Sequence, residues 1–202
     1  PALTDGAPRG VKLGSGLDAL VQVIEPYLSN KANPLSDALC LTAIPQGIAA
    51  LKRLAEAEDK AARDALAYVS PSGGLALANA GLGAVHGLAG VIGGRFNAPH
   101  GLSCGRLLGP VLAANSRELG ASVRFGEVQR WLSEGFNLPE TDTFDALAAL
   151  LDGWGLDRLN RWIPKGTDLG ETAHEAAASS SMRANPCVLS QDALESCIRA
   201  AL

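Results

Sequence analysis

Apolar positions recur every three or four residues over most of the 202-residue chain. Between residues 16 and 29 they fall at Leu17, Leu20, Val21, Ile24 and Leu28. This spacing places apolar side chains on one face of a helix, and a serine at position 15 is a suitable N-cap. A proline at position 26 should kink that helix near its end. Residues 1–13 contain Pro and Gly without periodicity and predict an extended lead-in.

The rest of the chain repeats the helical period. Asn33 and Pro34 should begin a second helix, because proline is well suited to the first helical position, and a bend is expected at Pro45. Further helices are predicted at 59–69, 72–80, 100–115, 123–135, 143–153, 168–179 and 190–202. Aromatic content is only 4%, and few windows alternate with period two, so strands should be nearly absent. The expected fold class is all-α, with about seven to ten helices.

Glycine and alanine dominate the middle of the chain, from residue 73 to residue 87. Small residues let helices approach closely, so this segment should form the buried centre of a bundle. Close packing explains the glycines better than a phosphate-binding loop does, because no β-branched run precedes them.

Charge and hydropathy argue against nucleic acid and membrane as partners. A net charge of -4 and a pI near 5.4 leave no basic stripe for nucleic acid. The longest apolar stretch, 75–92, is interrupted by Asn79 and His86, which disfavours a membrane span. Nothing at the start of the chain resembles a secretion signal, so a cytoplasmic protein is expected.

The four cysteines have no paired spacing and are interpreted as free buried thiols, not as disulfides or zinc ligands: Cys40, Cys104, Cys187 and Cys197.

Four polar residues form a candidate metal site. Asp18 and Gln22 lie four residues apart and should share a helix face, while His86 and His100 stand in a Gly-rich run. One carboxylate, one amide oxygen and two imidazoles would suit a divalent transition metal. An aspartate within an otherwise apolar face is costly to bury unless it is paired or bound to a cation. The metal would supply that compensation.

Segments 16–29, 79–115 and 179–186 resemble the C-terminal half of the iron-containing (group III) alcohol dehydrogenases, which are related to dehydroquinate synthase. The family holds its metal with an Asp, a His one turn later, a His in a Gly-rich helix and a His in a Pro-His-Gly sequence. Asp18, His86 and His100 match in order and spacing, whereas Gln22 stands at the second position. Gly90 replaces a family His often assigned to proton transfer. The resemblance implies a multi-helix bundle of the dehydroquinate synthase-like C-terminal type, with residues 1–202 forming a helical metal-binding domain.

The resemblance also implies the chemistry. A divalent metal, Fe(II) or Zn(II), would polarise the oxygen of a small alcohol or aldehyde while hydride passes to or from NAD or NADP. Gln22 would be a fourth ligand or a donor to bound water, and its weaker oxygen would shift preference toward Fe(II), Mn(II) or Mg(II).

The dinucleotide should be bound mainly by the family's N-terminal nucleotide-binding half, which has no counterpart in these residues. We therefore interpret the chain as the C-terminal half alone, with that N-terminal half as its partner, and we expect a homo-oligomer. No residue is assigned to catalysis beyond the ligands, or to cofactor binding. Two alternatives stay open: half of a maleylacetate reductase-like enzyme, and a non-catalytic helical scaffold or partner-binding subunit.

Overall fold

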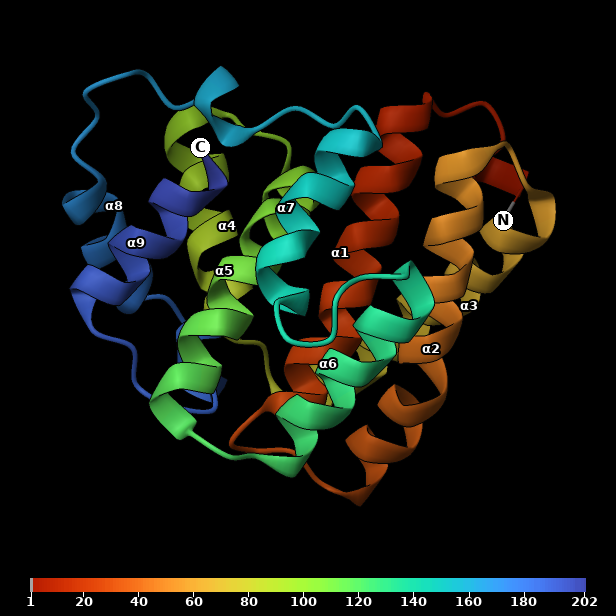
Figure 1. Cartoon of the computed structure of the whole chain (residues 1–202), viewed down its shortest axis with the longest axis horizontal. Helices are drawn as coiled ribbons and strands as arrows, with labels where there is room; N and C mark the ends of the chain where they lie inside the picture. The colour runs from red at the N-terminus through yellow and green to blue at the C-terminus, as the bar shows by residue number, and fades with distance from the viewer. Residues whose placement is uncertain (1) are drawn as a thin grey trace.

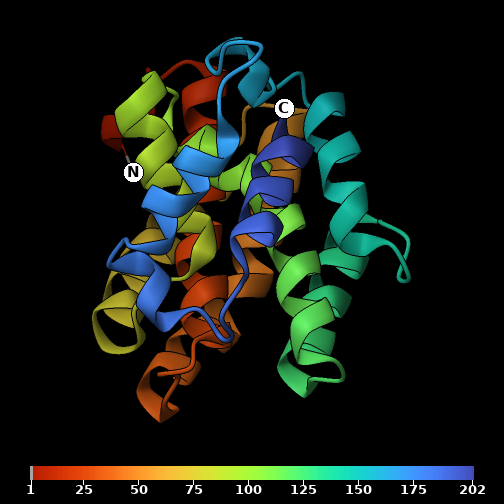
Figure 2. The ribbon, with the colours of Figure 1, turned by 90° about the vertical axis from the view of Figure 1, so that its left-hand side faces the viewer.

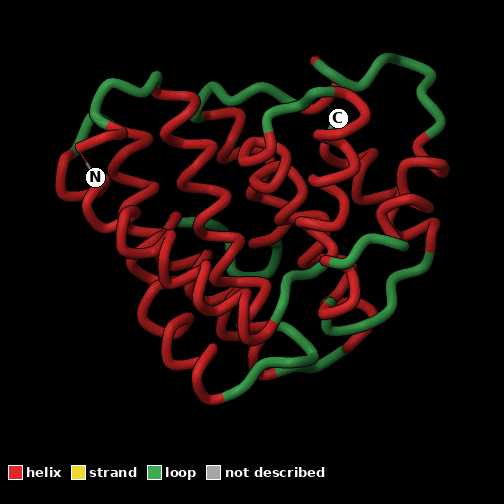
Figure 3. Tube along the Cα trace, turned by 180° about the vertical axis from the view of Figure 1, so that it is seen from behind, coloured by secondary structure: helices red, strands yellow, loops and turns green. Residues whose placement is uncertain are grey.

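The computed structural model describes residues 2–202, and these residues fold into helices joined by short loops, without a β-strand (Figure 3). The α-helices are α1 (Arg9–Leu28), α2 (Pro34–Glu56), α3 (Lys60–Ala80), α4 (Ala84–Phe96), α5 (His100–Leu119), α6 (Val123–Phe136), α7 (Thr143–Gly153), α8 (Leu169–Ala177) and α9 (Gln191–Ala201). Three short 3-10 helices accompany them: Ala2–Thr4, Leu159–Arg161 and Ser181–Ala184. The all-α prediction is confirmed for this part of the chain.

Helix α1 runs through the centre of the bundle (Figure 1). It packs against α2 and α3 on one side and against α5 on the other, and α4, α8 and α9 continue the packing beyond α5 (Figure 2). Leu20 and Ile24 of α1 are completely buried, together with Ile44 of α2 and Leu107 of α5. A polar group on the buried face of α1 therefore needs a partner within the protein.

The start of α1 differs from the prediction. The helix begins at Arg9 after Pro8, not at residue 16, so the expected extended lead-in over residues 1–13 is wrong from residue 9 onward, while residue 1 lies outside the described residues. Gly10 and Gly14, in the first two turns, obscure the apolar period, and tertiary contacts stabilise this part of the helix instead. Arg9 donates hydrogen bonds to the carbonyls of Trp154 and Ala55 at 2.7 Å each, and Leu13 is fully buried.

Helix α3 is continuous where the sequence predicted two pieces. Pro71 lies inside it without ending it, and the hydroxyl of Ser72 donates to the carbonyl of Tyr68 at 2.8 Å. Packing along α1 and α2 holds both halves of α3 in line. Pro26 and Pro45 are likewise accommodated within α1 and α2. Tertiary packing thus overrides the local disruption by proline.

The small-residue segment forms a sharp corner. Helix α3 ends at Gly81, whose φ of 75° suits glycine, and α4 then departs at 106° to α3. Residues 84–89 of α4 are all buried, which confirms the predicted buried centre for α4. The C-terminal half of α3 partly faces outward, with Leu75 59% exposed.

Among the described residues, helix α2 is the single helix long and apolar enough to span a membrane, and α3 with α4 meets that criterion only as a bent pair. Of the apolar window in α2, 44% is buried against the bundle, and core helices of soluble proteins meet the same criterion. None of the four cysteines forms a disulfide in the structure; Cys40, Cys104 and Cys197 are buried, as expected, whereas Cys187 is only partly buried.

Candidate metal centre

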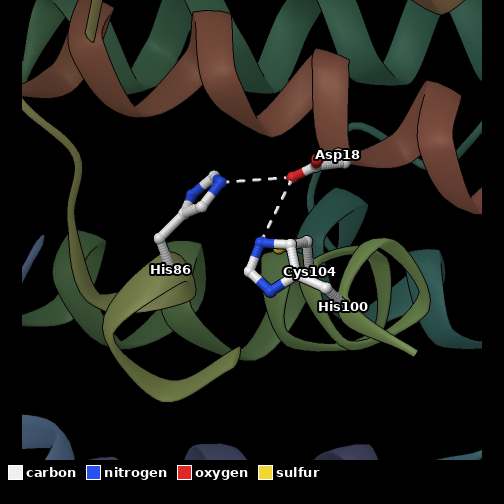
Figure 4. A group of neighbouring side chains, drawn as sticks. All are labelled: Asp18, His86, His100 and Cys104. Atoms are coloured by element: carbon white, nitrogen blue, oxygen red, sulfur yellow. Dashed lines mark hydrogen bonds and ion pairs between the residues drawn. The ribbon is translucent and has the colours of Figure 1, made fainter. Parts of the chain in front are cut away.

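Three helices bring a carboxylate and two imidazoles together in the interior (Figure 4). Asp18 comes from α1, His86 from α4 and His100 from the first turn of α5. The thiol of Cys104, one turn further along α5, joins them, and one ligand atom from each of the four residues lies within 4.8 Å of the others. Sequence spacing predicted the first three residues as neighbours, and the structure places them so.

Two glycines of α5 explain how Asp18 reaches α5. A Cβ at Gly101 would collide with the carbonyl oxygen of Gly14, and a Cβ at Gly105 would lie 2.6 Å from Cδ1 of Leu17. These two positions are one turn apart and share the face of α5 that meets α1. The backbones can therefore approach closely at the height of Asp18.

A buried glutamate orients His86. Glu25, only 7% exposed, accepts a hydrogen bond from the amide nitrogen of Val85 at 2.7 Å with Oε1, and its Oε2 lies 2.6 Å from Nδ1 of His86. Val85 lies in the first turn of α4, where a carboxylate also interacts favourably with the helix dipole. A Cβ at Gly83 would lie 2.9 Å from Glu25 Oε1, so glycine leaves room for the carboxylate. With Nδ1 occupied, Nε2 of His86 faces Asp18 Oδ1 at 3.2 Å.

A buried asparagine from the C-terminal part of the chain secures the same helix start. Asn185 Oδ1 accepts from the amide nitrogen of Ala84 at 3.0 Å, and its Nδ2 donates to Asn115 Oδ1 at 2.7 Å. These bonds tie the segment that follows the last 3-10 helix to both α4 and α5. The position of His86 is therefore fixed from two sides.

His100 lies at the open side of the cluster. The turn before it contains Asn97, which adopts a left-handed conformation with φ of 54° and ends α4, and Pro99, which precedes α5. Nε2 of His100 is 3.6 Å from Asp18 Oδ1. The His100 side chain is 48% exposed, whereas that of His86 is 6% exposed. Access from outside is therefore past His100.

Gln22 lies beside Asp18, as the shared helix face predicted. Its Nε2 donates to Asp18 Oδ2 at 3.2 Å, the carboxylate oxygen that is not paired with the histidines. A Cβ at Gly73 would lie 2.8 Å from Cβ of Gln22, so α3 packs directly against this side chain. The predicted role of Gln22 as a fourth ligand stays a prediction.

The charges in the cluster are strongly coupled. Burial acts to raise the pKa of Asp18, but the hydrogen bond and positive charge of His86, with the charge of His100, bring that pKa below its usual 3.8. Burial acts to lower the pKa of His86, but its interactions with Asp18, Cys104 and Glu25 raise that pKa to about 12. An imidazolium therefore bridges two carboxylates in the metal-free protein. A divalent cation can supply the same positive charge by displacing the proton.

The ligand spacing fits a divalent ion. Oxygen and nitrogen ligands at about 2.0–2.1 Å from zinc in a tetrahedron are separated by about 3.3–3.4 Å. The separations of Asp18 Oδ1 from the two histidine Nε2 atoms are 3.2 and 3.6 Å. The donors are also of the types that iron and zinc accept.

Two residues of the site were missed by the sequence reasoning. Glu25 follows Asp18 by seven residues and Cys104 follows His100 by four, so each lies on the same helix face as a predicted ligand. An acidic residue within the apolar run 20–28 was a signal for a buried, partnered charge.

Residues 12–202 match the profile of the "Fe-containing alcohol dehydrogenase family, C-terminal". The chain belongs to the iron-containing alcohol dehydrogenase family. It is 38% identical to alcohol dehydrogenase 4 of Schizosaccharomyces pombe over 129 residues, which cover 63% of this chain and 31% of the relative. It is 32% identical to the probable alcohol dehydrogenase EutG of Escherichia coli over 187 residues, covering 92% of this chain and 47% of the relative.

Solved structures agree with this assignment. The structure of a 1,3-propanediol oxidoreductase superposes with a TM-score of 0.88 at 28% identity, covering 100% of this chain and 54% of the other. The chain thus spans about half the length of this structural relative, and it corresponds to the all-helical C-terminal half of the family.

Proposed function

We propose that this chain is the metal-binding half of an NAD(P)-dependent alcohol dehydrogenase or aldehyde reductase, with residues 1–202 forming one helical domain. The observation that carries the proposal is the meeting of Asp18, His86 and His100 from three helices at ligand spacing. The resemblance described above assigns these positions to the family's metal ligands. The relatives named above, and the lactaldehyde reductase of Escherichia coli at 37% identity over 139 residues, are oxidoreductases by name.

Each side chain of the site has a role that suits this reaction. Asp18, His86 and His100 would hold the ion, Fe(II) or Zn(II), and Gln22 would be the fourth ligand or would hold the Asp18 carboxylate in place. When bound, the metal supplies Lewis-acid chemistry toward a substrate oxygen. Glu25 keeps the Nδ1 proton on His86, so that Nε2 stays free to ligate. The open side past His100 is the route for a small alcohol or aldehyde.

Gly90 affects how the proton of the substrate hydroxyl would reach solvent. This glycine is on the exposed side of α4, and a Cβ there would meet nothing within 4 Å. The space that a family histidine would fill is thus open to water. Proton exchange between the substrate hydroxyl and solvent would then run through water in this protein.

The dinucleotide and the assembly complete the proposal. NAD or NADP would be bound mainly by an N-terminal nucleotide-binding half, the chain's principal partner, and the whole would form a homo-oligomer in the cytoplasm. The 31% to 54% coverage of the relatives' length supports a partner half of similar size.

Reassembly tests the proposal. The metal-loaded chain is combined with a nucleotide-binding half of the family, and NADH or NADPH absorbance is followed with short diols and aldehydes. Turnover should need both halves and the metal, and His86→Ala should abolish it. Turnover by the 202-residue chain alone, or full activity in His86→Ala, would contradict the proposal. A complex that binds its partner but turns over no alcohol or aldehyde would favour the scaffold.

A further inference from the structure

Cys104 occupies a place in the cluster that the family's ligand set leaves unexplained. It lies one turn after His100 on α5 and is completely buried. Its Sγ is 3.5 Å from Nε2 of His100, and the thiol also interacts with Asp18 and His86. The other cysteines lie on different helices or loops, outside this group.

The sulfur stands at the spacing of a metal ligand. With a zinc–sulfur bond of about 2.3 Å and a zinc–nitrogen bond of about 2.05 Å, tetrahedral ligands are about 3.5–3.6 Å apart. The observed separation of Cys104 Sγ from His100 Nε2 is 3.5 Å. Asp18, His86, His100 and Cys104 together form one compact set of four donors.

Gln22 is engaged elsewhere. Its amide nitrogen donates to Asp18 Oδ2, while Oδ1 of the same carboxylate faces both histidines. The Gln22 side chain thereby holds the carboxylate in the orientation that presents Oδ1 to the site. In this structure the Gln22 amide thus supports a ligand, which is the role of outer partners that orient metal ligands.

We propose that Cys104 is the fourth metal ligand of this chain, replacing the ligand that relatives carry at position 22, with Gln22 positioning Asp18. This inference rests on the proposed metal site and specifies its composition as one carboxylate, two imidazoles and one thiolate. On binding, the metal–sulfur bond forms as the S–H bond breaks, and the proton leaves to solvent.

The sulfur changes the preferred metal. A dication with Asp18 and Cys104 thiolate as anionic ligands is a neutral group, which suits the buried side of the site. Thiolate is a soft ligand that selects zinc over manganese and magnesium, and zinc lies above Fe(II) in the affinity order for nitrogen and sulfur sites. The chain should therefore select Zn(II), and the harder-metal preference expected for a glutamine ligand is replaced.

Cobalt(II) is the probe, because it takes zinc sites and reports its ligands by absorption. The chain, purified under reducing conditions, is titrated with Co(II) without oxygen. We expect one equivalent to produce visible d–d bands of a four-coordinate ion and a near-ultraviolet thiolate-to-cobalt charge-transfer band. Zn(II) should displace the cobalt and remove both the d–d bands and the charge-transfer band. Cys104→Ser should lose the charge-transfer band and weaken Zn(II) binding by at least the roughly 10- to 100-fold that loss of an outer partner of a ligand costs.

Controls separate the possible failures. Cys187→Ser is the matched control, because the Cys187 thiol lies outside the site, where it donates a hydrogen bond to Asn115 Oδ1 at 3.2 Å. The cobalt spectrum of this variant should equal that of the parent. Gln22→His in the Cys104→Ser background should regain affinity without the charge-transfer band, which guards against a misfolded single variant. Visible bands without a charge-transfer band in the parent would overturn the Cys104 assignment and leave the proposed site standing. No binding at all would overturn both.

Discussion

Replacing Glu25 with glutamine should weaken the metal site while leaving the fold nearly intact. Glu25 uses one oxygen for the amide of Val85 and the other for Nδ1 of His86. Glutamine keeps the shape and can keep the acceptor for Val85, but it presents an amide NH₂ to the Nδ1–H of His86. Two donors then face each other.

The least costly escape is loss of the Nδ1 proton from the His86 imidazolium. The glutamine NH₂ can then donate to Nδ1, and Nε2–H still donates to Asp18. All hydrogen bonds are satisfied in that arrangement, but one charge-assisted hydrogen bond is lost, so the free energy of unfolding of the metal-free protein should fall by about 1.5–3 kcal/mol. The metal must displace the Nε2 proton and return the ring to its Nδ1–H form, in which two donors face each other. Outer partners of ligating histidines commonly alter affinity by about 10- to 100-fold, which is about 1.4–2.8 kcal/mol.

Isothermal titration with Zn(II) and urea unfolding of the metal-free protein measure the two quantities separately. Glu134→Gln, on the exposed face of α6, is the matched control and should change neither. Glu25→Ala should differ from Glu25→Gln in stability, because it leaves the buried Val85 N–H unpaired at a cost of about 1–3 kcal/mol. Zinc binding by Glu25→Gln that equals the parent would refute the role given to Glu25.

Two further predictions concern helix packing and pH. Gly101→Ala should destabilise the protein by about 1–3 kcal/mol and weaken metal binding, because its Cβ would push α5 from α1; Gly94→Ala, which meets nothing, should stabilise α4 by up to about 1 kcal/mol in thermal unfolding. Equal effects of the two alanines would contradict this. Burial and Glu127 raise the pKa of Tyr27 from 10.0 to about 12, so in the Tyr68→Phe variant the remaining tyrosinate absorbance should have its midpoint near pH 12. Because the folded protein holds this proton longer, the stabilisation is present below pH 10 and is lost between pH 10 and 12; a midpoint at 10 in the folded variant would contradict the burial argument.

The helices were predictable because each carries an apolar face at helical period, and the start of α2 because Asn33 and Pro34 are local signals that tertiary contacts did not override. The start of α1 could not be predicted, because its first turn depends on hydrogen bonds to carbonyls far along the chain. The continuity of α3 through Pro71 was missed for a related reason, because packing against two helices outweighs one lost backbone bond.

The candidate site divides in the same way. Order and spacing along the sequence brought Asp18, His86 and His100 together through the family resemblance. Which side of each imidazole is free depends on Glu25, and the place of Cys104 depends on how closely α1 and α5 approach at Gly101. Neither is encoded in the spacing of residues on a single helix.

One divalent metal ion should bind where α1, α4 and α5 meet. Crystals of the chain grown with Zn(II) and measured on both sides of the zinc absorption edge test it most directly. A single anomalous peak bounded by Asp18 Oδ1, His86 Nε2 and His100 Nε2 is the predicted result. An anomalous map without a peak at these atoms, in crystals of protein supplied with excess zinc, would contradict it.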